Sequence, residues 1–146
     1  MKKIILFFVF SGIITFMYGQ NLSVYLDEGP RGSLHKVGSD NTYQMAFRIS
    51  GLSDEAAVNQ FTTKCKSFQG VVDISVNAMD KTGQRTALIV LNEKKNDDFF
   101  KSFMQYAGVA KIFSGNKEYT PDNLNMLKKD RAEAKTVKKG MEKSPR

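Results

Sequence analysis

Cysteine and histidine are almost absent from this chain, which contains one of each, Cys65 and His35, and no tryptophan. A single thiol forms no intramolecular disulfide, so packing must hold the fold, and zinc sites built on several thiolates are excluded. The sequence also contains no glycine-rich phosphate loop, no Ser-His-Asp set and no His-x-x-x-His pair. Because Cys65 and His35 stand far apart on dissimilar segments, they make a poor nucleophile and base. We therefore expect no catalytic residues and no enzymatic activity.

Long apolar runs are also missing, except for one at the N-terminus. Lys2 and Lys3 precede an apolar stretch over residues 4–18, and Gly19 offers a small residue at a cleavage point. This layout is typical of a secretory signal peptide, and the stretch is shorter than the roughly 20 residues of a transmembrane helix. We predict that residues 1–19 are a signal peptide cleaved after Gly19, which leaves a periplasmic or secreted protein with no membrane attachment. A permanent N-terminal anchor is the less favoured alternative.

Negative charge is in short supply, and the formal net charge is +7. Lys2 and Lys3 leave with the signal peptide, and residues 120–146 carry eight basic and four acidic side chains. The remaining body of the chain is therefore close to neutral. A basic tail on a neutral domain favours solubility or a loose electrostatic contact, so we expect no nucleic-acid partner.

Strand and helix patterns alternate over residues 42–115, which we predict to be one domain. The predicted strands are residues 42–50, 71–78, 85–92 and 109–113. The first of two amphipathic helices follows an N-cap Ser53, and the second follows an N-cap at Asn96 or Asp97. The order βαββαβ predicts an α+β, ferredoxin-like sandwich, in which a four-stranded antiparallel sheet carries two helices on one face.

The segments on either side are predicted to lie outside this domain. Residues 20–41 are rich in turn signals, and we expect a lead-in segment whose residues 24–26 form a short strand or dock on the domain. Thr120 and Pro121 suit an N-cap and a first helical position, so residues 120–146 are predicted to form a basic C-terminal helix and tail.

Four short motifs lie at the boundaries or inside the strands and helices of this pattern. The segment Phe47-Arg48-Ile49-Ser50-Gly51-Leu52-Ser53 leads into the first helix, Gly70-Val71 opens the second strand, Ala87-Leu88-Ile89 lies in the third, and Gly108 follows the second helix. Together they resemble a heavy-metal-associated (HMA-like) domain, the ferredoxin-like module of copper chaperones and metal-pumping ATPases. The resemblance covers roughly half of the chain without its signal peptide.

The metal motif of that family, Gly-Met-Thr-Cys-x-x-Cys, is degenerate here. Residue-by-residue transfer places Asp54 and Ala57 at the two cysteine positions, and soft ions such as copper(I) need sulfur ligands. We therefore expect no metal and no cofactor at this loop. Cys65 falls on the apolar stripe of the first helix, which predicts a buried thiol. It is the weak alternative ligand if copper or zinc is bound.

The resemblance also implies which side chains face away from the helices. Leu88 and Val90 are expected on the open face of the sheet, near Arg48 and Ala46, and none of these positions offers the aromatic side chains of RNA-binding relatives of this fold. Two branched residues on a polar face indicate a contact surface. The alternatives are a partner, or coverage by the lead-in segment or the C-terminal helix.

Two functional hypotheses follow. In the first, the protein is an exported, non-catalytic binding or adaptor module that has lost the thiolate metal site and engages an unknown protein partner or a second copy of itself. In the second, it is a divergent periplasmic protein of metal homeostasis that uses non-standard ligands, such as Cys65 with a methionine or between the chains of a homodimer.

Overall fold

The computed structural model describes residues 21–27, 34–37 and 40–141. The predicted signal peptide, residues 1–19, lies outside these ranges. The elements in chain order are β1 (Leu22–Leu26), β2 (His35–Val37), β3 (Thr42–Ser50), α1 (Glu55–Lys66), β4 (Val71–Val76), β5 (Arg85–Leu91), α2 (Asp97–Ala107), β6 (Val109–Ser114), β7 (Lys117–Tyr119), the 3₁₀ turn η2 (Pro121–Asn123) and α3 (Leu124–Met141). Within the described ranges, no helix is both long and apolar enough to span a membrane.

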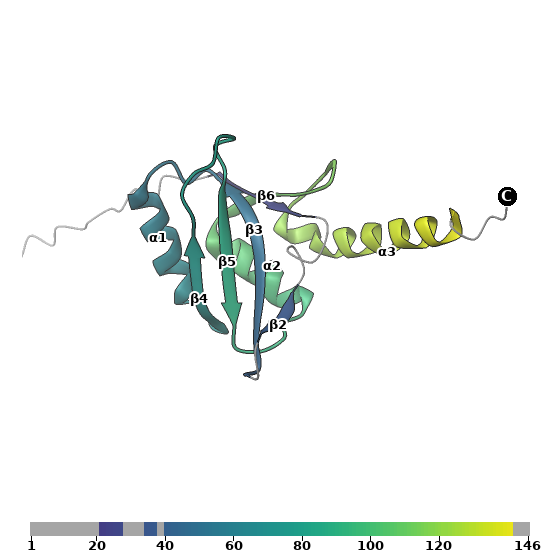
Figure 1. The fold of residues 1–146 in the computed structure, drawn as a ribbon, viewed down its shortest axis with the longest axis horizontal. Coiled ribbons are helices and arrows are strands. Elements are labelled where there is room, and N and C mark those ends of the chain that lie inside the picture. Colours follow the sequence, from purple (N-terminus) through teal and green to yellow (C-terminus); the bar gives the residue numbers. More distant parts are fainter. Residues whose placement is uncertain (1–20, 28–33, 38–39, 142–146) are drawn as a thin grey trace, which may run out of the picture.

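The α+β class is confirmed, but the prediction of a four-stranded antiparallel sheet is wrong. One mixed sheet contains seven strands in the order β4-β5-β3-β1-β6-β7, with β2 also paired to β3 (Figure 1). β3 to β6 and the two helices between them keep the predicted chain order, and β5 is antiparallel to both β3 and β4. The sheet departs from a clean ferredoxin-like arrangement at β1, which separates β3 from β6 and runs parallel to β6.

β1 belongs to the core of the sheet, although the sequence places it in a lead-in segment. Leu22 and Val24 are 2% and 0% exposed, and Val24 pairs with Ile49 on one side and Ile112 on the other. Gly51 lies against its start: a Cβ there would stand 3.1 Å from the carbonyl oxygen of Asn21. Its φ of +99° also suits glycine, so Gly51 both turns the chain after β3 and makes room for β1.

The main helices begin and end at identifiable caps. The N-cap of α1 is Asp54 rather than Ser53: its carboxylate accepts a hydrogen bond from the amide of Ala57 at 2.8 Å. Asn96 caps α2, and Gly108 ends that helix in the left-handed conformation with φ 84°. Both residues before α1 are good N-caps, so sequence preference alone could not separate them.

One face of the sheet forms the core with α1 and α2. Period-two alternation directs one side of β3 and β5 inward, and helical spacing directs one stripe of each helix onto them. The inward residues of β3 and β5 are Met45, Phe47, Ile49, Ala87, Ile89 and Leu91, and the helices contribute Val58, Phe61, Cys65, Phe103 and Met104. This part of the predicted pattern is confirmed.

β4 departs from strict alternation. The sequence predicts Val72, Ile74 and Val76 on one side, but the register with β5 shifts between Val71 and Asp73, which marks a bulge. As a result Val72 is 54% exposed, while Val71 packs against the core. Such irregularity is common in edge strands, where it hinders pairing with other chains.

The C-terminal helix is anchored at its beginning and then leaves the body. Leu124 and Leu127 pack against the core, whereas residues 132–137 are all exposed and the helix projects away from the sheet (Figure 1). The anchor is reinforced by Asp130, whose carboxylate accepts from the hydroxyl of Tyr119 at 2.7 Å and pairs with Lys117 at 2.9 Å. These hydrogen bonds, that of Lys117 first, lower the pKa of Asp130 below its usual 3.8.

Candidate functional site: the open face of the sheet

The loop between β3 and α1 holds the residues at the degenerate metal motif. The Asp54 carboxylate is used by the helix cap, and Ala57, which is 5% exposed, has no donor atom. A third residue, Arg85, reaches this loop from the start of β5. Its guanidinium donates to the carbonyl of Leu52 at 3.2 Å and lies 3.1 Å from the carboxylate of Glu55.

This loop does not fit a bound metal ion. Arg85 is 6% exposed and carries a permanent positive charge, which disfavours a second cation close by. Within the described ranges, no group of three or more histidine, cysteine, aspartate or glutamate side chains could hold a metal. The Asp54 carboxylate caps a helix, and the Arg85 guanidinium binds the loop to β5. Both groups therefore stabilise the fold.

Cys65 lies in the core, as predicted, and is fully buried. Burial raises the pKa of its thiol from 9.0 to about 12, against a weaker opposing effect of Lys64. The thiolate, which is the reactive and metal-binding form, is therefore strongly disfavoured. The structure does not bring Cys65 together with Asp54, which stands at the other end of α1.

The three residues predicted to form an interaction surface share the open face of the sheet. Leu88 of β5 pairs with Ala46, Val90 with Gln44, and Arg48 lies two positions along β3 from Ala46. Since neighbours in register point to the same side, all of them face away from the buried residues. Leu88 and Val90 are half-buried.

This surface continues across β1 and β6, where it gains two aromatic rings that the sequence reasoning missed. Tyr25 pairs with Arg48 on one side and with Phe113 on the other. The rings of Tyr25 and Phe113 stack at 4.9 Å, and the guanidinium carbon of Arg48 lies 5.8 Å from the Tyr25 ring centroid. In the sequence, Tyr25 and Phe113 are adjacent to Val24 and Ile112, which face inward. This alternation places the two rings on the open face only when β1 is known to lie beside β6. We call the surface formed by Tyr25, Ala46, Arg48, Leu88, Val90 and Phe113 the open-face patch.

The charges around the open-face patch are paired. Arg48 lies 2.9 Å from the carboxylate of Asp27 and also donates to Gln84 at 3.0 Å. Lys111 pairs with Glu118 at 3.0 Å. Asp73, opposite Val90, pairs with Lys66, and the hydrogen bond from Lys66 lowers the pKa of Asp73. The patch thus combines aliphatic and aromatic side chains with one ion-paired arginine, which lies between the two groups.

The described elements leave this face uncovered. α1 and α2 pack on the other face, and Figure 1 shows α2 behind β5 and β3. Neither alternative cover applies to the described part of the chain, because β1 is inside the sheet and α3 lies beside inward-facing Met45 and Leu26. Comparisons with known proteins gave no match: no family model, no curated protein and no solved structure matches this chain.

Proposed function

We propose that this chain is an exported, non-catalytic adaptor that binds a protein partner through the open-face patch. The observation that carries the proposal is the patch itself: aliphatic and stacked aromatic side chains from four adjacent strands, which no described element covers. Contact surfaces are enriched in aromatic residues and arginine and poor in unpaired charge at the centre, and the patch has this composition.

The chemistry of the patch favours a protein segment with apolar side chains as its partner. Nucleic-acid binding depends on cations free to contact phosphates, whereas Arg48 and Lys111 are each paired with a carboxylate. The two stacked rings also cover one another on one side, which removes ring surface that bases would use.

A site-specific photocrosslinker tests this proposal. The crosslinking amino acid is placed at Leu88, within the patch, and as a matched control at Met126, which is 55% exposed on α3. The full chain is produced in its own organism, irradiated, and adducts are identified by mass spectrometry. We expect a discrete adduct with one other protein at position 88 and none at position 126.

A second variant ties the adduct to the patch. Val90→Asp adds an unpaired charge beside position 88 on a half-buried site and should abolish the adduct without unfolding the protein. Equal adducts at both positions, or none at position 88, would contradict the proposal. An adduct between two copies of the chain would mean that the partner is a second copy of this protein, which then forms a homodimer.

The absence of a metal function is part of the same proposal and has its own test. Isothermal titration of the purified protein with copper(I) and zinc(II) should give no stoichiometric uptake. Uptake that disappears in Cys65→Ala would instead support the metal-homeostasis alternative. Sequencing of the N-terminus of the protein from its own cells should start at Gln20 if export proceeds as proposed.

A further inference from the structure

A small pocket lies on the other side of the sheet from the open-face patch, where α2 and α3 meet β1 and β3. Its volume is about 110 Å³. Six apolar side chains line it: Leu26, Met45, Phe100, Met104, Leu124 and Leu127. Four of these come from β1, β3 and α2 and the other two from α3, so the pocket exists only because α3 docks at its beginning.

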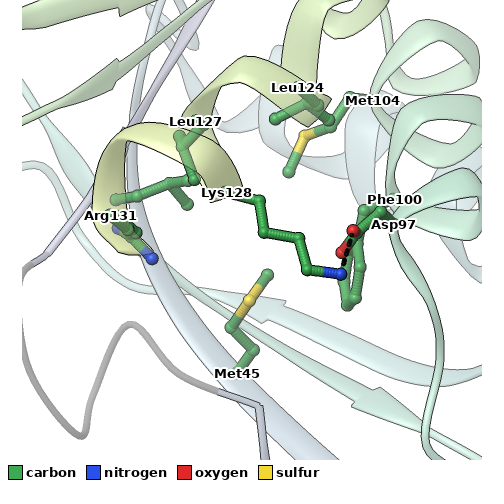
Figure 2. A pocket seen from close by; sticks show the side chains of 9 residues that line it. Met45, Asp97, Phe100, Met104, Leu124, Leu127, Lys128 and Arg131 are labelled. Atoms are coloured by element: carbon green, nitrogen blue, oxygen red, sulfur yellow. Dashed lines mark hydrogen bonds and ion pairs between the residues drawn. The ribbon is translucent and has the colours of Figure 1, made fainter. Parts of the chain in front are cut away.

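Charged side chains stand at the rim of this pocket. Figure 2 shows Lys128 reaching across it toward Asp97, with the ammonium nitrogen 2.9 Å from a carboxylate oxygen. Both side chains are largely exposed, 74% and 54%, and exposed pairs of this kind are weak. The pair therefore spans the opening without closing it firmly.

Arg131 is the third charged residue of the rim. Its guanidinium donates to the hydroxyl of Ser114 at 2.9 and 3.3 Å, and no carboxylate within the described ranges pairs with it. It is also half-buried. A half-buried guanidinium that is satisfied by one neutral hydroxyl keeps most of its donors and all of its charge for another group.

We propose that this pocket binds a small amphipathic carboxylate, whose apolar end fills the pocket and whose carboxylate pairs with Arg131. An apolar cavity of about 150 Å³ accommodates a benzene ring, so the pocket holds a chain of roughly four to six carbons. Guanidinium groups match carboxylates through two parallel hydrogen bonds, which fixes the orientation of such a ligand at the rim.

A soft metal ion is the competing occupant, because Met45 and Met104 place two thioethers in the pocket wall. The charges at the rim decide against it. Lys128 and Arg131 carry two positive charges against the single negative charge of Asp97, so the entrance attracts an anion and repels copper(I).

Ligand titration followed by nuclear magnetic resonance tests the proposal on the purified protein. Hexanoate is compared with 1-hexanol, which has the same chain without the charge, and with acetate, which has the charge without the chain. We expect one-to-one binding of hexanoate that shifts the methyl signals of Met45 and Met104, binding of hexanol at least tenfold weaker, and no such shifts with acetate.

Three variants show which side chains contribute to the binding of hexanoate. Arg131→Gln should reduce the affinity for hexanoate to that for hexanol, whereas Lys129→Gln, a matched loss of charge on an exposed neighbour outside the pocket, should leave it unchanged. Leu124→Phe, which fills the pocket from a half-buried position, should abolish binding of both. Circular dichroism confirms that each variant is folded.

Several results would overturn the proposal. They are equal affinity for hexanoate and hexanol, hexanoate binding that survives Arg131→Gln, methyl shifts confined to residues outside the pocket, and copper(I) uptake that displaces hexanoate. The crosslinking at Leu88 does not depend on this pocket, so the two ideas fail separately.

Discussion

Replacement of Arg85 by methionine should measure how much one buried guanidinium contributes to the fold. Arg85 lies on the inward side of β5, opposite Ile49, and is 6% exposed. It donates to two main-chain carbonyls, those of Leu52 at 3.2 Å and Asn77 at 3.3 Å, and pairs with Glu55. It therefore connects three segments: the turn after β3, the start of α1 and the end of β4.

The expected loss is about 2–3 kcal/mol in the free energy of unfolding. A hydrogen bond from a charged donor contributes about 1.5–3 kcal/mol, and a buried carbonyl left without a donor costs about 1–3 kcal/mol. Methionine recovers part of this, because an apolar side chain avoids the cost of burying a charge. Glu55 adds little, since its side chain is 78% exposed and such pairs contribute about 0–1 kcal/mol.

Urea denaturation followed by far-ultraviolet circular dichroism is the assay, because the chain has no tryptophan to report on unfolding. The same loss corresponds to a melting temperature lower by about 10 °C in a domain of this size. Arg85→Lys, which keeps the charge and loses the planar fork, should fall between the two proteins, and Glu55→Gln should differ from the parent by less than about 1 kcal/mol. If Arg85→Met unfolds within about 0.5 kcal/mol of the parent protein, the guanidinium does not clamp the loop and this reasoning is refuted.

Three further predictions concern β1, the thiol and the anchor of α3. Val24→Asp buries an unpaired carboxylate between β3 and β6 and should abolish the cooperative unfolding transition, whereas a stable folded variant would mean that β1 is dispensable. Cys65, with a thiol pKa of about 12 in place of 9.0, should react with a thiol reagent at neutral pH at least about a thousandfold more slowly than in the urea-unfolded chain; equal rates would show that it is accessible. Because hydrogen bonds lower the pKa of Asp130, the stabilisation of α3 that it provides is complete above pH 3.8 and is lost as the pH falls through the lowered value. The protection factors of the amides in the first turns of α3, which compare each exchange rate with that of the unstructured chain at the same pH, should therefore fall in acid in the parent protein but not in Asp130→Asn.

Local patterns in the sequence were sufficient for the part of the fold from β3 to β6. Period-two alternation placed Phe47 inward correctly, because the two faces of β3 differ clearly in polarity. β5 carries apolar residues on both faces, so alternation alone could not orient it, and the expectation that Leu88 and Val90 face outward came from the resemblance. The bulge at Val72 was not predictable in this way, since a residue extruded from an edge strand leaves no mark on the alternation around it.

Non-local pairing explains what the sequence could not reveal. β1 offers only three inward positions, Leu22, Val24 and Leu26, and nothing in five residues specifies which of the available strands they will join. The aromatic half of the open-face patch, Tyr25 and Phe113, was missed for the same reason. Arg48 and Leu88 could be expected on the same face because both lie on strands whose pairing follows from the chain order.

The parallel pairing of β1 with β6 also sets the order in which the sheet can be completed. A ribosome releases Leu22 early and its neighbour Val109 only after most of the chain has been made. Until β6 is made, β1 either stays unpaired or pairs with β3 and leaves its own other edge exposed. Contacts between residues this far apart along the chain also form slowly. A nascent chain that ends before β6 therefore cannot close its sheet, and acquisition of the native state must follow synthesis of nearly the whole protein.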